Sequence, residues 1–250
     1  MKVRQSRTRL DTLLVKRGLA ASLSKAQAMI LAGEVLVDGV RVSKSGTAIA
    51  SEALLEINSR EQKYSSRGGF KLEGALRDFE VDPAGRVCLD IGSSTGGFTD
   101  CLLQHGAMRV YAVDVTVDQI AWKLRQDARV LRIERNARGL KPQDIPEPVD
   151  LVTVDVSFIS AAKVLAPAIT LARAGADFLI LIKPQFELRR DEIGPGGIVS
   201  DPSLHERAIL QLRQASESAG LTCLGVKPSQ LSGAEGNQEY FLHARKNSVE

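Results

Sequence analysis

The stretch CLDIGSSTGGFTDCLL, residues 88–103, decides the fold of most of this chain. It joins a short apolar run over residues 87–91, typical of a buried strand, to an amphipathic helical pattern from Phe98 to Gln104. Several glycines between them let the backbone turn tightly and approach a ligand. The loop fits neither GxGxxG nor GxxxxGK(S/T), so the pattern excludes a nucleotide P-loop.

Strand and helix patterns alternate from this stretch to the end of the chain. Because strands that alternate with helices form a mainly parallel sheet covered on both faces, we predict an α/β fold with a doubly wound, Rossmann-like sheet. The predicted strands are residues 87–91, 109–115, 128–133, 150–157 and 176–183, then TCLGVK and EYFLHAR; the predicted helices are residues 98–104, 117–126, 160–174 and 204–219, with another in SRGGFKLEGALRDF.

Two features near the start of this domain indicate a cofactor site. The glycine-rich loop, with Gly92, Gly96 and Gly97, lies at the carboxyl edge of the first strand, where open α/β sheets bind ligands. Asp114 closes the second strand, and an acid in that place can accept hydrogen bonds from ribose hydroxyls. Asp90, the glycines and Asp114 together predict a nucleoside-type cofactor whose identity depends on the loop.

Charge is distributed unevenly along the chain. Residues 1–71 carry 13 Lys plus Arg against 6 Asp plus Glu, whereas the remaining 179 residues carry 20 against 24. A basic front part on a mildly acidic body is typical of a polyanion-binding module joined to another domain, or of a solvated basic face.

The basic part predicts a compact unit of two helices and a hairpin. Leucines with helical spacing precede Gly18, and Ser24 with Gln27 predicts a capping box for a second helix that ends before Gly33. Valines alternate around the Asp-Gly turn at residues 38–39, which is typical of a hairpin. Phosphate contacts from its basic side chains would give affinity without sequence reading. These side chains are Arg7, Arg9, Lys16, Arg17, Lys25, Arg41 and Lys44.

Composition and motifs argue against several classes of protein. No apolar run reaches the roughly 18–20 residues of a membrane helix, and the N-terminus MKVRQSRTRLDTLL is too charged for a signal peptide. The cysteines form neither a disulfide framework nor a zinc spacing, and the histidines show no metal-ligand pattern. We expect no metal, no membrane association, no stable protein partner and a cytoplasmic location.

The N-terminal string RLDTLLVKRGLAASLSKAQAMILAGEVLVDGVRVSKSG resembles the RNA-binding S4 domain over roughly residues 7–60. Further along, SRGGFKL, VTVDVSFIS, LIKPQFE, GPGGIVSDP and GNQEYFL resemble, in the same order, the TlyA family of ribosomal RNA methyltransferases. The catalytic domain of that family is of the FtsJ type, a class I S-adenosylmethionine (SAM) methyltransferase. The resemblance implies an RNA-binding domain at 1–60, a linker at 61–66 and a methyltransferase domain at 67–250.

The resemblance also implies a catalytic tetrad, which falls on Lys71, Asp155, Lys183 and Glu239. The strand pattern supports two of these positions, because Asp155 and Lys183 end predicted strands at the edge that carries the cofactor loop. A lysine that ends the apolar run FLILIK is unusual for packing. The implied cofactor is SAM, and its implied contacts are Asp90, Gly92, Ser94, Thr95, Gly96, Gly97, Asp114, Asn136 and Asp155. The chain departs from the family pattern after Asp114, in VTVDQIAW, and around Asn136, in IERNARGL.

The implied reaction is methyl transfer to a ribose 2′-hydroxyl of a cytidine in ribosomal RNA or in assembled ribosomal subunits. By the resemblance Lys183 is the base, and the other three tetrad residues orient it and the ribose. A lysine with the ordinary pKa of about 10.4 is protonated at neutral pH; burial and a nearby ammonium favour its neutral form, whereas a nearby carboxylate raises its pKa again. The chain ends soon after its last predicted strand, which favours 23S RNA over methylation of both 16S and 23S RNA.

Three alternatives remain open at this point. A base methyltransferase normally carries an Asn/Asp-Pro-Pro-aromatic motif after the fourth strand, where this chain reads DVSFIS. A hemolysin-like, membrane-active protein would use the basic helical segment at residues 9–32 on anionic lipid. A ribosome assembly factor without activity would not need the complete tetrad.

Overall fold

The chain divides into two compact units, residues 1–62 and 63–250, which are considered separately. The predicted domain boundary at residue 60 lies outside the described residues. Part of the predicted linker, residues 63–66, belongs to the second unit, where Tyr64 is fully buried. The computed structural model describes residues 7–31, 33–57, 63–233 and 235–248.

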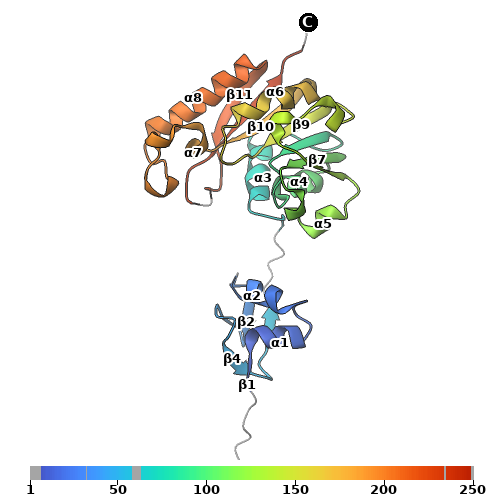
Figure 1. The fold of residues 1–250 in the computed structure, drawn as a ribbon, viewed down its shortest axis with the longest axis vertical. Coiled ribbons are helices and arrows are strands. Elements are labelled where there is room, and N and C mark those ends of the chain that lie inside the picture. The colour runs from blue at the N-terminus through green and yellow to red at the C-terminus, as the bar shows by residue number, and fades with distance from the viewer. Residues whose placement is uncertain (1–6, 32, 58–62, 234, 249–250) are drawn as a thin grey trace, which may run out of the picture. The chain divides into compact units, whose positions relative to one another are not determined.

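The first unit packs two helices against short strands (blue in Figure 1). Leu10, Leu14 and Ile30 from the helices are fully buried with Val35. The predicted hairpin turn at residues 38–39 has φ of 49° and 79°, the left-handed conformation that a two-residue hairpin turn needs. The elements are β1 (Arg7–Arg9), α1 (Leu10–Lys16), α2 (Leu23–Leu31), β2 (Val35–Val37), β3 (Val40–Arg41), β4 (Ala48–Ala50) and β5 (Leu55–Ile57).

The predicted N-cap of the second helix is wrong by two residues. Ser24 lies inside α2, and the side chain that caps this helix is Ser22, whose Oγ accepts a hydrogen bond from the Lys25 backbone N–H at 3.2 Å. Two serines flank Leu23, and either could have capped a helix of this pattern. Gly18 and Gly33, predicted to follow the two helices, both adopt the left-handed conformation, with φ of 70° and 72°.

The second unit is built on a seven-stranded sheet with the order β11-β12-β10-β9-β6-β7-β8. Strands β6 to β10 pair in parallel, and β12 runs antiparallel between β10 and β11. The predicted doubly wound, mainly parallel sheet is therefore confirmed. Its elements are α3 (Gly68–Asp78), β6 (Val87–Ile91), α4 (Gly97–Gln104), β7 (Arg109–Asp114), α5 (Trp122–Arg125), β8 (Val130–Glu134), β9 (Val149–Val154), α6 (Ala162–Leu171), β10 (Ala172–Ile182), α7 (Pro184–Glu187), α8 (Pro202–Ser218), β11 (Leu221–Pro228) and β12 (Tyr240–Lys246).

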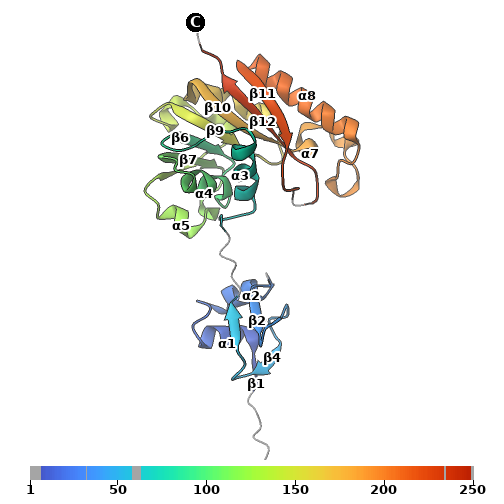
Figure 2. The same cartoon turned by 180° about the vertical axis from the view of Figure 1, so that it is seen from behind.

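Helices cover both faces of this sheet, α3 and α4 on one and α6 and α8 on the other (Figures 1 and 2). The alternation along β6 shows the two faces, because Cys88 packs with α3 and α4 whereas Leu89 packs with α6. Both side chains are fully buried. A strand buried on both faces accounts for the continuous apolar run in the sequence.

One predicted helix is interrupted. Residues 117–126 form a 3-10 turn, Val117–Gln119, and the short helix α5, with extended backbone at Ile120 and Ala121. The break turns Ile120 inward, where it is almost fully buried with Leu124 beside Gly96. Packing against the glycine-rich loop thus overrides the helical pattern.

Candidate active site

The glycine-rich loop leaves β6 at the carboxyl edge of the sheet and runs into α4. Gly92 has a φ of 85°, and a Cβ there would lie 2.3 Å from the backbone oxygen of Asp155. Gly96 has a φ of 90°, and a Cβ there would lie 2.3 Å from Leu124. Glycine is required at both positions because the neighbouring chain passes so closely.

Asp114 holds the loop from the end of β7. Its carboxylate accepts hydrogen bonds from the backbone N–H of Ser94 at 2.9 Å and of Thr116 at 3.2 Å. Asn136 lies opposite, and its Oδ1 accepts a hydrogen bond from the Arg138 backbone N–H at 3.1 Å. Asp114, Asn136 and Ser94 line one cavity of about 420 Å³, together with the apolar side chains Val113, Val115, Val156 and Ile159.

Asp90 does not reach this cavity, although the sequence grouped it with the cofactor contacts. It is fully buried beneath the loop, where it accepts hydrogen bonds from Thr99 Oγ1 at 2.6 Å and Thr153 Oγ1 at 2.9 Å. Burial raises the pKa of Asp90 to about 6, while the two hydroxyl groups act in the opposite direction. Asp90 therefore ties α4 and β9 to β6 and shapes the loop from below.

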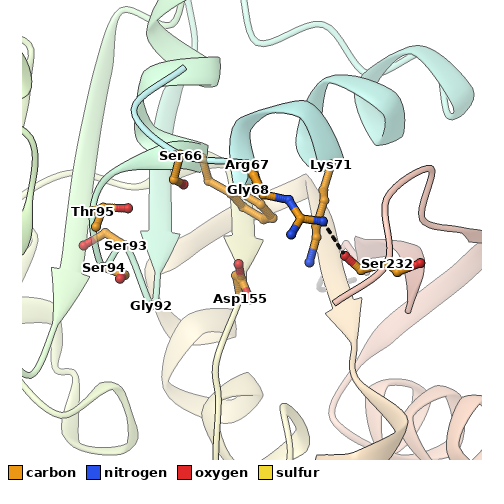
Figure 3. Close-up of a pocket in the computed structure, with 12 residues that line it drawn as sticks. Ser66, Arg67, Gly68, Lys71, Gly92, Ser93, Ser94, Thr95, Asp155 and Ser232 are labelled. Carbon is orange, nitrogen blue, oxygen red and sulfur yellow. Dashed lines mark hydrogen bonds between the residues drawn. The ribbon is translucent and has the colours of Figure 1, made fainter. Parts of the chain in front are cut away.

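A second, smaller cavity continues from the loop toward α3 (Figure 3). Gly92, Ser94 and Asp155 line both this cavity and the first one. On its other side stand Lys71 and Arg67, and Arg67 donates a hydrogen bond to the backbone oxygen of Ser232 at 3.4 Å. Thr95 and Gly97 also line this cavity.

The four predicted tetrad residues form two ion pairs. Lys71 Nζ lies 2.6 Å from Glu239 Oε2, and Lys183 Nζ lies 2.6 Å from Asp155 Oδ1. The side chain of Glu239 is 2% exposed, those of the two lysines 12% and that of Asp155 22%. Lys183 also donates a hydrogen bond to Ser157 Oγ at 2.9 Å. The chain thus holds two lysine side chains and two carboxyl groups close to the cofactor loop with little contact with solvent.

A third cavity, of about 630 Å³, lies on the other side of these pairs. Lys71, Lys183 and Glu239 line it, and it shares Ser157 and Phe158 with the first cavity. Phe158 is 88% exposed, with a φ of 66°, and its ring lies 5.3 Å from that of Phe186. The wall is completed by Gln185, Arg190, Ile193, Gly194, Gly197 and Glu235.

Sequence reasoning did not assign roles to Ser157, Phe158 and Arg67. Ser157 and Phe158 stand in the quoted motif DVSFIS directly after the strand-ending Asp155, so their positions carried a signal. Arg67 belonged to the predicted entry into α3, where nothing in its neighbourhood indicates that it reaches the chain near residue 232.

The predicted RNA-binding side chains of the first unit are all exposed. Two of them also make internal bonds. Arg9 forms an ion pair with the fully buried Asp11 at 2.6 Å, and Arg17 donates a hydrogen bond to the Ala53 backbone oxygen at 2.8 Å. The remaining five are Arg7, Lys16, Lys25, Arg41 and Lys44. These five side chains are exposed cations, the kind of group that phosphate contacts require.

Comparisons with known proteins agree with this geometry. The FtsJ-like methyltransferase family matches residues 64–246, and the S4 domain matches residues 8–53. The 16S/23S rRNA (cytidine-2′-O)-methyltransferase TlyA of Mycobacterium tuberculosis is 48% identical over 241 residues, which are 96% of this chain and 90% of that protein. Hemolysin A of Brachyspira hyodysenteriae is 42% identical over 94% of this chain and 98% of its own length. A solved structure from Streptococcus thermophilus, described as a hemolysin, has a TM-score of 0.76 and 37% identity, and the match covers 98% of this chain and 90% of that one.

The second unit is thus an FtsJ-like methyltransferase domain, of a fold class that depends on SAM in general. With an S4 domain in front of it and TlyA at 48% identity over nearly the whole length, the chain belongs to the TlyA family of ribosomal RNA methyltransferases. Among the described residues, no helix has both the length and the apolar character that crossing a bilayer requires.

Proposed function

We propose that this chain transfers a methyl group from SAM to the 2′-hydroxyl of a cytidine in ribosomal RNA. The observation that carries this proposal is the presence of two ion pairs, Lys71–Glu239 and Lys183–Asp155, beside the glycine-rich loop. Relatives named as cytidine-2′-O-methyltransferases support the choice of hydroxyl and nucleoside. The S4 domain in front supports RNA as the substrate.

The residues of the first two cavities fit SAM. Asp114 offers a carboxylate for the ribose hydroxyls, and the apolar side chains around Asn136 suit a flat adenine ring. Gly92, Ser94 and Thr95 border the second cavity and leave backbone close to a bound amino-acid portion. When bound, SAM supplies an electrophilic methyl group. The chain itself must bring the hydroxyl into line with that group and take up its proton.

Lys183 is the group that takes up this proton in the proposal. A lysine nitrogen can take part in several hydrogen bonds; in the structure Lys183 donates one to Ser157 Oγ, and Asp155 Oδ1 lies 2.6 Å from the nitrogen in an ion pair. A further position on the Lys183 nitrogen is available to the 2′-hydroxyl, because Lys183 lines the third cavity, where the substrate would lie. The proton moves from the hydroxyl oxygen to the Lys183 nitrogen in its neutral form, while Asp155 holds the nitrogen in place.

Lys71 and Glu239 orient the ribose. Lys71 lines both the second and third cavities, so its ammonium stands between the SAM side and the RNA side of the site. Glu239 keeps that ammonium in position through the 2.6 Å ion pair. Placing a hydroxyl in line with a bound methyl group lowers the barrier in its own right, beside the removal of the proton.

The test is the transfer of a tritiated methyl group from SAM to unmodified ribosomal subunits, with 30S and 50S assayed separately. We expect label in RNA with the wild-type chain and none with Lys183→Ala, while SAM affinity measured by calorimetry stays close to wild type. Lys163→Ala is the matched control, because Lys163 is exposed on α6 outside the three cavities. Wild-type turnover by Lys183→Ala would refute its role, and unlabelled RNA with the wild-type chain would refute the function.

A further inference from the structure

We propose that Asn237 is a positioning residue that links Glu239 to one wall of the third cavity, in which the RNA nucleotide would lie. The inference rests on the proposed function and adds to it a residue outside the tetrad. Asn237 is 1% exposed, and a buried amide of this kind must have hydrogen-bond partners. Its partners are the reason for the proposal.

The side chain of Asn237 holds the segment GPGGIV, residues 194–199, at two points. Its Oδ1 accepts a hydrogen bond from the Val199 backbone N–H at 2.8 Å, and its Nδ2 donates one to the Gly197 backbone oxygen at 2.8 Å. Gly197 and Gly194 line the cavity of about 630 Å³ that also contains Lys183 and Glu239. Asn237 therefore fixes one wall of the cavity in which the RNA nucleotide would lie.

The backbone of Asn237 faces the other way, toward Glu239. Its carbonyl oxygen accepts a hydrogen bond from the Gly233 N–H at 2.9 Å. A Cβ at Gly233 would lie 2.6 Å from Glu239 Oε1, so this glycine lies directly against the carboxylate that pairs with Lys71. One residue thus contacts the cavity wall through its side chain and the support of Glu239 through its backbone.

A second set of contacts connects Val199, through His205, to Tyr240, the residue after Glu239. The backbone oxygen of Val199 lies 2.7 Å from His205 Nε2, and His205 Nδ1 lies 3.0 Å from the hydroxyl of Tyr240. With the proton on Nε2, the ring donates to Val199 and accepts from Tyr240. Residues on both sides of Glu239 along the chain, Asn237 and Tyr240, are therefore tied to Val199.

Because of this ring of contacts, the wall segment and Glu239 move together or not at all. Loss of the Asn237 amide frees the wall and loosens the support of the Lys71–Glu239 pair in one step. Misplacement of reacting groups by about 1 Å can cost about 100-fold in rate. Asn237 and Val199 line neither of the two SAM-side cavities, so SAM binding should not change.

The experiment compares Asn237→Ala and Tyr240→Phe with the wild-type full-length chain on unmodified ribosomal subunits. Tyr240→Phe keeps the ring and removes only the hydroxyl, so it carries the test if Asn237→Ala does not fold. The matched control is Asn247→Ala, because Asn247 also uses its side chain in a hydrogen bond, to Thr222 at 2.6 Å, but lies past the other end of β12. Steady-state kcat and KM are measured together with SAM affinity and the thermal midpoint.

We expect Asn237→Ala to lower kcat by about 10- to 100-fold and Tyr240→Phe to lower it less, with SAM affinity within about twofold of wild type. The double variant should lose less than the product of the two single losses, because both changes release the same segment. A kcat within twofold of wild type in both variants would overturn the inference, as would a loss of SAM affinity that matches the loss of kcat. An inactive wild-type chain would instead refute the proposed function itself.

Discussion

Removal of one partner of the Lys71–Glu239 pair should destabilise the second unit strongly. The side chain of Glu239 is 2% exposed, so Lys71→Met leaves a carboxylate in the interior without its counter-ion at 2.6 Å. Breaking a buried ion pair in this way costs about 3–5 kcal/mol. That is a large part of the roughly 5–15 kcal/mol by which a domain is stable.

The double variant Lys71→Met with Glu239→Leu separates stability from chemistry. Replacing both members of a buried pair by apolar groups is often neutral or stabilising, so most of the lost stability should return. Methyl transfer should remain absent in both variants, because the ribose then lacks the Lys71 ammonium. Urea unfolding followed by circular dichroism gives the stabilities, and tritium transfer to ribosomal subunits gives the activity.

Two results would refute this reasoning. A free energy of unfolding for Lys71→Met within about 1 kcal/mol of wild type would show that the Glu239 carboxylate does not depend on its partner. Recovery of activity together with stability in the double variant would show that the pair serves the fold alone.

Three further predictions concern the cofactor side. Gly92→Ala should abolish SAM binding in calorimetry, because its φ is 85° and its Cβ would lie 2.3 Å from a backbone oxygen; Gly139→Ala, where the space is open, should bind normally. Asp114→Ala should weaken SAM binding at least about tenfold, since hydrogen bonds to a charged group are worth about 1.5–3 kcal/mol; unchanged affinity would contradict the ribose contact. Burial raises the pKa of Asp90 from 3.8 to about 6. Because this carboxyl then ionises at lower pH in the unfolded chain than in the folded one, the free energy of unfolding should fall by about 3 kcal/mol as the pH rises through this range. Asp90→Asn should remove that slope in urea unfolding series at several pH values.

The sequence sufficed for the central strands β6, β7 and β9, because they are buried on both faces and therefore appear as apolar runs. Interruptions were harder to predict. The break in the predicted helix at residues 117–126 comes from Ile120, which packs by the glycine-rich loop, and a local helical pattern carries no information about that contact. In the same way, only the folded chain shows that Ser22 rather than Ser24 caps α2.

For the site, the charged residues at strand ends could be predicted from the sequence, but the direction of their side chains could not. Asp155 and Lys183 follow apolar strands, and the structure joins them by an ion pair. Asp90 also belongs to a strand that leads to the loop, yet its side chain points to Thr99 and Thr153 below. Whether an acid within a strand faces a ligand or the core depends on partners 9 and 63 residues away, which no local pattern encodes.

Glu239 shows how chain direction builds the site. Asp155 and Lys183 come after their strands β9 and β10, because parallel strands bring their carboxyl ends to one edge. Strand β12 runs antiparallel to β10, so its amino end lies at that same edge, and Ile182 pairs with Tyr240 there. An acidic residue near this strand can therefore reach Lys71 only if it precedes the strand, as Glu239 does. A search restricted to residues that follow strands cannot find it, whereas a search that allows for one reversed strand can.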